Sequence, residues 1–71
     1  MSEQRQTVNV EQVPVRSLTR GQRAMDAHNE PFTVGSVCTT DFGVEVYDKD
    51  IPGAIALEAR DPDDLVLRVV R

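Results

Sequence analysis

The sequence predicts a small α+β protein, mainly β, with an antiparallel sheet of four to five strands and one short helix. Two observations lead to this prediction. Apolar residues recur at every second position in four stretches between Phe32 and Val70, and a turn signal separates each stretch from the next. A side-chain period of two is typical of half-buried antiparallel strands, because successive residues point to opposite faces of the sheet.

The alternating stretches define four predicted strands, at residues 32–39, 43–48, 54–60 and 65–70. In the first, Cys38 has the same parity as Phe32 and Val34, so we expect it to be buried with them as a small apolar side chain. The last two strands flank a tight turn. We therefore expect residues 54–70 to form a hairpin.

Three turn signals separate these strands. Gly43 closes a reversal over residues 40–43, where a positive φ is needed. The sequence Ile51-Pro52-Gly53 is typical of a type II turn, because proline presets the first central residue and glycine accepts the positive φ of the second. Residues 61–64 favour a type I turn, in which the carboxylate of Asp61 accepts a hydrogen bond from the backbone.

Before these strands, residues 7–15 predict a first strand that lies at a sheet edge, since Pro14 cannot donate to a ladder. Its apolar residues change parity at residues 11–12, which predicts a bulge there. We expect residues 1–6 to form a flexible polar tail and residues 7–71 to form a single small globular domain.

Residues 17–29 contain the signals of a short helix. Ser17 is a good N-cap, Asn29 can close the helix, and Pro31 cannot continue it. Leu18 and Ala24 lie on a narrow apolar stripe. Gly21 weakens the middle by about 1 kcal/mol relative to alanine, so such a helix needs packing against the sheet.

Size and composition restrict the protein to a thin core. The chain has 71 residues, of which 39% are apolar and only 4% aromatic, so aliphatic side chains must supply most of the buried area. Such a core favours association with a partner that adds buried surface. No segment has the features of an export signal or of a membrane-spanning helix, so we expect a cytoplasmic protein, free or associated with a virion, that has no membrane partner.

The chemistry-bearing residues argue against catalysis and metal binding. Asp48 and Asp50 match the start of a calcium loop, but Ala59 stands where its bidentate glutamate belongs. The single histidine, His28, lacks catalytic partners, because Asp26 is too near in the sequence to face it on a helix and Cys38 is expected to be buried. We therefore expect no enzymatic activity, no metal and no cofactor.

Acidic residues are concentrated in one part of the chain. The formal net charge is −4, and residues 41–64 hold eight acids against two bases, which is a local balance of −6. Most of these acids fall at turns, where they either cap the local backbone or form a surface for a basic partner. The candidate partner-binding acids are Asp48, Asp50, Asp61, Asp63 and Asp64.

Three arginines form a second candidate surface. Arg16, Arg20 and Arg23 have spacings of four and three, which would bring them to one face of the predicted helix. Such a face suits phosphates or a docking protein, and its plain alternative is a solvated face or local pairing with Asp26 and Glu30. The acidic balance of the chain and its scarcity of aromatic residues argue against nucleic acid.

From these features we expect a small non-enzymatic protein-protein interaction module. It would bind another protein, from a host or a virion, or a second copy of itself as a homo-oligomer. A viral or mobile-element accessory subunit or inhibitor has this size and composition. The alternative is a small nucleic-acid-associated regulator that uses the arginine face.

Overall fold

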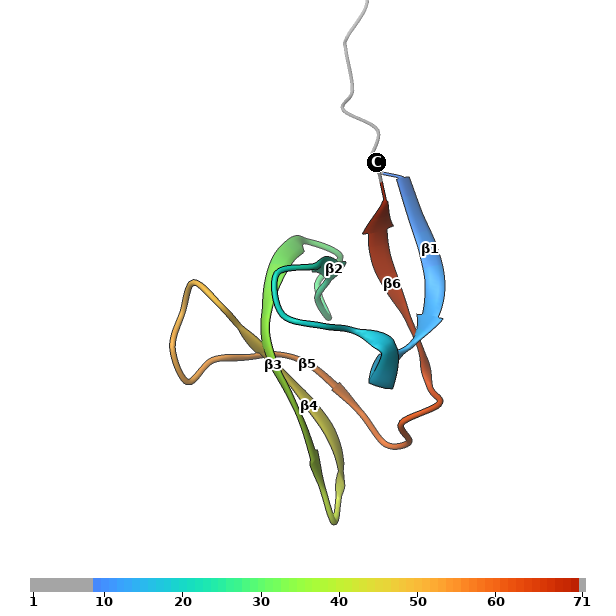
Figure 1. The fold of residues 1–71 in the computed structure, drawn as a ribbon, viewed down its shortest axis with the longest axis vertical. Coiled ribbons are helices and arrows are strands. Elements are labelled where there is room, and N and C mark those ends of the chain that lie inside the picture. The colour runs from blue at the N-terminus through green and yellow to red at the C-terminus, as the bar shows by residue number, and fades with distance from the viewer. Residues whose placement is uncertain (1–8, 71) are drawn as a thin grey trace, which may run out of the picture.

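The computed structural model describes residues 9–70, which form a six-stranded sheet in which every pair of neighbouring strands is antiparallel (Figure 1). The strand order is β1-β6-β2-β3-β4-β5. The elements are β1 (Asn9–Pro14), a 3-10 helix η1 (Val15–Ser17), β2 (Arg23–Met25), β3 (Pro31–Thr40), β4 (Gly43–Asp48), β5 (Ile55–Ala59) and β6 (Leu65–Val70). The prediction of a small, mainly β, antiparallel protein is thus confirmed. Its strand count was too low, because β2 was missed.

The long strand β3 belongs to both halves of the sheet. Its first residues pair with β2 and its later residues with β4, and the register shifts between Val34 and Ser36. Gly35 lies at this shift, where a Cβ atom would lie 2.9 Å from the Cα atom of Lys49. The two halves of the sheet enclose a core of seven buried side chains: Val15, Leu18, Ala24, Phe32, Val34, Val44 and Val46.

The same register shift explains why one burial prediction is wrong. Cys38 was expected to be buried with Phe32 and Val34, but it is exposed. A β-bulge inserts one residue and thereby reverses the faces of all residues beyond it. Val37 consequently packs against the core, while Cys38 lies on the outer face opposite Glu45.

The predicted helix over residues 17–29 is also wrong. This segment contains the end of η1, a turn, the strand β2 and a second turn. Gly21 has a φ of 92°, which a helix cannot accommodate. Its N–H donates to the carbonyl of Val34 at 2.9 Å, and the N–H of Val34 donates to the carbonyl of Gln22 at 2.8 Å. Long-range backbone bonds to β3 therefore replace the local bonds of a helix.

The side chains that suggested helix boundaries cap shorter structures instead. The Ser17 hydroxyl donates to the Pro14 carbonyl at 2.7 Å and so closes η1. Asn29 adopts a φ of 63° in the turn that follows β2. Pro31 begins β3. Each of these residues does mark the end or start of an element, but the element is a 3-10 helix, a turn or a strand and not the predicted helix.

The predicted hairpin over residues 54–70 is correct in its strands and its turn but wrong in its pairing. The Asp64 N–H donates to the Asp61 carbonyl at 3.0 Å, as the predicted turn requires. However, β5 pairs only with β4, whereas β6 pairs with β1 and β2. The other two turns form as predicted, with φ values of 141° at Gly43 and 81° at Gly53.

The start of β6 is drawn to β1 by contacts with η1. The N–H of Val15 donates to the Asp64 carbonyl at 2.8 Å, and that of Arg16 donates to the Pro62 carbonyl at 3.1 Å. The Arg16 guanidinium also contacts the Asp63 carboxylate at 2.7 Å. Because these contacts orient the chain as it leaves the turn, β6 continues along β1 rather than folding back along β5.

Strand β1 lies at an edge of the sheet, as Pro14 predicted. Its register with β6 is continuous from Asn9 to Pro14, so the bulge expected at residues 11–12 is absent. The side chains of Glu11 and Arg68 form an ion pair directly across the two strands. The predicted tail and the first residues of the predicted strand lie outside the described residues. No helix between residues 9 and 70 is long and apolar enough to cross a membrane.

The close approach at Gly35 predicts that Gly35→Ala destabilises the fold. The added methyl group would meet backbone atoms of Lys49, which cannot rotate away as a side chain can. We expect the free energy of unfolding to fall by about 1–3 kcal/mol, the usual range for overpacking. Chemical denaturation measures it. Ser36→Ala, at the exposed neighbouring position, is the matched control, and an equally small effect of both changes would contradict the prediction.

Candidate functional site

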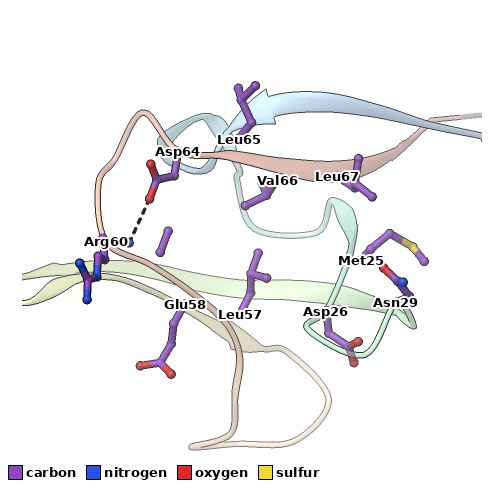
Figure 2. A pocket seen from close by; sticks show the side chains of 11 residues that line it. Met25, Asp26, Asn29, Leu57, Glu58, Arg60, Asp64, Leu65, Val66 and Leu67 are labelled. Carbon is purple, nitrogen blue, oxygen red and sulfur yellow. Dashed lines mark hydrogen bonds between the residues drawn. The ribbon is translucent and has the colours of Figure 1, made fainter.

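A cleft of about 510 Å³ separates β5 from the first half of β6. Figure 2 shows that the loop between the two strands closes one end of the cleft, where Arg60 and Asp64 lie. Residues of β2 and the turn after it, including Met25 and Asp26, line the other end. The cleft exists because β5 and β6 do not pair.

Apolar side chains form the middle of the cleft walls. Leu57 and Ala59 on β5 and Val66 on β6 are partly buried and pack against the core. Figure 2 shows Leu57 and Val66 pointing toward one another, whereas Glu58 and Leu65 point away from the cleft. The period of two within each strand thus directs every second side chain into the cleft.

The cleft also exposes unpaired backbone of β5. A methyl group on Gly43 would overlap the carbonyl oxygen of Ala59, so this carbonyl points toward β4. Backbone groups alternate in direction along an antiparallel ladder, which turns the N–H and C=O of Glu58 away from β4. Within residues 9–70, no other strand pairs with this edge of β5.

On the opposite side of the cleft, β6 has a shorter free backbone edge. Ala24 and Arg68 form the one register pair between β2 and β6, so residues 65–67 extend beyond it. The Asp64 carbonyl is bonded to Val15 on the β1 side. By the same alternation, the backbone groups of Leu65 point to the other side, toward β5.

A second hollow, of about 410 Å³, continues along the same strand edge. On one side it is lined by β5, from Ile55 to Glu58. On the other side it is lined by the turn after β2, which includes Asp26 and His28. Asp26, Leu57 and Glu58 line both hollows. The two hollows together form a groove beside the free edge of β5, from Ile55 to Ala59.

The cleft between β5 and β6 is acidic. Asp26 and Asp64 line it together with one base, Arg60, which gives a formal balance of −1, and Glu58 adds its charge on the outer face beside the cleft. The Asp26 carboxylate accepts hydrogen bonds from the backbone N–H groups of His28 at 2.8 Å and Glu30 at 2.9 Å. The bond from Glu30 is the main reason that the pKa of Asp26 lies below its ordinary value. Partial desolvation opposes this shift, and His28 adds to it.

The outer face of β4 and β5 carries two acids directly opposite each other, Glu45 and Glu58. The Tyr47 hydroxyl donates to the Glu45 carboxylate at 2.9 Å, and this bond raises the pKa of Tyr47. Glu58 has no ion-pair partner in the described part of the chain. Like charges at such a cross-strand position destabilise the pair.

The acids that the sequence singled out mostly bond to their own turns. Oδ1 of Asp61 accepts from the Asp63 N–H at 2.9 Å, and Oδ1 of Asp48 accepts from the Asp50 N–H at 2.8 Å. The Asp64 carboxylate accepts from the N–H groups of Arg60 and Asp61. This is the backbone-capping role expected for turn acids. Of the five, only Asp64 lines the cleft.

The three predicted arginines do not share a helix face, because the helix is absent. Arg16 pairs with Asp63 beside η1. Arg20 lines a smaller hollow with Lys49 and Asp48. Arg23 lies on β2, opposite Thr33. The geometric reason for regarding them as one surface is therefore lost.

Sequence reasoning missed the residues that form the cleft, chiefly Leu57, Glu58 and Val66. Their alternation was recognised, but alternation does not show whether two strands pair with each other. The like charges of Glu45 and Glu58 were visible in the sequence only after the register of β4 and β5 was known. Within residues 9–70, no group of three His, Cys, Asp or Glu side chains is arranged to hold a metal ion.

Comparisons of the chain with protein-family models, with curated proteins and with solved structures gave no match.

The hydrogen bonds to Asp26 predict a pH-dependent turn. Because folding lowers the pKa of Asp26, its ionised form adds stability that is complete above the ordinary aspartate range. That stability disappears as the pH falls from about 4 through the lowered pKa. Amide chemical shifts of His28 and Glu30 should follow this titration, with a midpoint below the usual aspartate value. Asp26→Asn keeps an acceptor oxygen and should abolish the titration; an unchanged midpoint in that variant would contradict the assignment.

The register of β4 and β5 predicts that Glu58→Lys stabilises the protein. The change replaces a like-charge pair with an opposite-charge pair across the strands, and we expect a gain of about 1 kcal/mol in the free energy of unfolding. Denaturation at low and high salt measures the gain, which should shrink as salt screens the exposed charges. Glu58→Gln should give a smaller gain. A loss of stability at low salt would show that the two side chains are not neighbours.

Proposed function

We propose that the protein is a non-enzymatic protein-binding module whose β5 edge pairs with an extended segment of a partner protein. The observation that supports this proposal is the groove along β5, which combines a free backbone edge with apolar side chains in its walls. Partners that add a strand to a sheet use the same combination. Main-chain hydrogen bonds hold the added strand, and alternate side chains enter pockets.

Binding of a partner segment requires both the free backbone edge of β5 and the apolar side chains of the groove. A net hydrogen bond contributes about 0.5–1.5 kcal/mol, so the N–H and C=O of Glu58 alone would hold a partner only weakly. Association also costs translational and rotational freedom, which those two bonds cannot offset. The partner must therefore bury apolar area against Leu57, Ala59 and Val66.

The wider biological role remains part of the hypothesis. An accessory subunit or inhibitor, from a virus or mobile element and acting in the cytoplasm, agrees with the small size and the acidic charge. The turn acids and the arginines are secondary candidates for contacts at the margin of the interface. The arginine face that suggested a nucleic-acid partner depended on the absent helix. Nucleic-acid binding is therefore not proposed and serves only as an outcome of the test.

Proline substitution on the β5 edge tests the proposal. Random peptides displayed on phage are selected on the wild-type protein, and their binding is then measured to Glu58→Pro and Glu58→Ala. Glu58→Pro removes the outward N–H and blocks strand addition, so we expect at least a tenfold loss of affinity. Glu58→Ala keeps the N–H and should retain most of the binding. Leu65→Pro removes the cleft-facing N–H at the start of β6 and tests whether a segment that is bound to β5 also contacts the β6 side of the cleft.

Two results would overturn the proposal. One is peptide binding that is equally strong to the wild type and to both proline variants. The other is retention of a labelled DNA or RNA duplex at low salt that falls steeply with salt and is lost when Arg16, Arg20 and Arg23 become alanine. Light scattering during the same experiments reports whether the chain pairs with a second copy.

A further inference from the structure

We infer that the segment that binds along β5 has the pattern apolar-basic-apolar, with its lysine or arginine placed beside Glu58. This inference rests on the proposed function and specifies the chemistry of the partner. Three observations lead to it: the direction of the side chains on β5, the unpaired charge of Glu58, and the charge balance of the cleft.

The first observation determines which partner side chains face the cleft. Leu57 and Ala59 pack on the core side of β5, and Figure 2 shows Val66 facing Leu57 from β6. Side chains directly opposite each other on adjacent strands point to the same face. The partner residues that flank the position beside Glu58 therefore enter the cleft. Apolar side chains suit them, because they cover Leu57, Ala59 and Val66.

The second observation concerns the residue between them. It points to the outer face together with Glu58, whose neighbour on the other side is Glu45. Tyr47 donates a hydrogen bond to Glu45, whereas Glu58 has no ion-pair partner between residues 9 and 70. A basic side chain beside Glu58 would relieve the repulsion across β4 and β5. Because Glu58 is exposed, the ammonium or guanidinium group stays hydrated and avoids the cost of burying a charge.

The third observation selects a foreign segment over a second copy of this chain. Two β5 strands that pair antiparallel through the same edge would bring their Glu58 residues close together. The cleft beside Glu58 already has a formal balance of −1 from Asp26, Asp64 and Arg60. Self-pairing would therefore add like charges, whereas a basic segment is complementary to the groove.

Two short capped peptides test the inferred pattern. They share polar, threonine-rich flanks and differ only at the centre, which is Val-Lys-Val in one and Val-Glu-Val in the other. Each is titrated into the ¹⁵N-labelled wild-type protein and into Glu58→Lys, and amide shifts report both the site and the affinity. The wild type should bind the lysine peptide about tenfold more tightly than the glutamate peptide. Glu58→Lys should reverse this preference.

Asp50→Lys is the matched control, because it makes the same change of charge at an exposed position in the loop between β4 and β5. It should leave the preference of the wild type in place. A preference that reverses in both lysine variants would overturn the inference, since it would reflect net charge rather than the position of Glu58.

The remaining outcomes separate the inference from the proposed function. Equal binding of both peptides, with the largest shifts at the Glu58 amide, would overturn the inferred pattern but leave strand addition at β5 intact. Absence of binding by the lysine peptide would also overturn the inferred pattern. The phage selection against the proline variants then decides the proposed function independently.

Discussion

The contacts between η1 and the turn before β6 determine the architecture of this protein. Val15 and Arg16 donate their N–H groups to carbonyls of residues 64 and 62, and the Arg16 guanidinium pairs with Asp63. The ion pair is exposed and contributes little by itself. The two backbone bonds add to it, and the bond from Val15 matters most, because Val15 is fully buried and an unsatisfied N–H there would be costly. They attach the start of β6 to the β1 side and thereby leave β5 with a free edge.

The bend in β3 has an equally large effect on the other half of the sheet. The strand pairs with β2 up to Thr33 and with β4 from Val34 onward, and its register with β4 shifts at Gly35. Seven buried side chains fill the space between the two halves, and Phe32 is the only aromatic residue among them. A core of this size cannot cover both faces of every strand. Apolar residues near the ends of the strands, such as Ile55 and Leu65, consequently stay partly or largely exposed.

A free strand edge is a hazard for a small β protein, because it can pair with other copies of the chain. The acids beside the β5 edge counter this hazard. Glu58 faces outward along the edge, and Asp26 stays ionised because backbone N–H groups bond to its carboxylate. Such charges discourage pairing with an acidic chain and remain compatible with a basic one. Protection against self-pairing and the inferred partner preference then have the same physical origin.

The period of two by itself determined the location of the four strands from β3 to β6, and the turn residues determined where the chain reverses. Proline and positive-φ glycine act through local backbone geometry, so Pro52 and Gly53 could be interpreted without knowledge of the fold. The sequence also supplied the charges along the groove. The positions of these charges relative to one another could not be predicted. The alternation of side chains specifies which face of the sheet a residue occupies, but not which other strand lies beside it.

Tertiary structure decided the remaining features. Backbone N–H and C=O groups are chemically alike in every strand, so only the contacts with η1 show that β6 pairs with β1 and leaves β5 free. Similarly, the bulge at Gly35 moved Cys38 to the surface, and backbone bonds to Val34 prevented a helix at residues 17–29. Each of these outcomes depends on groups that are distant in the chain. Local patterns could not determine them, since the competing arrangements use the same residues with the same local preferences.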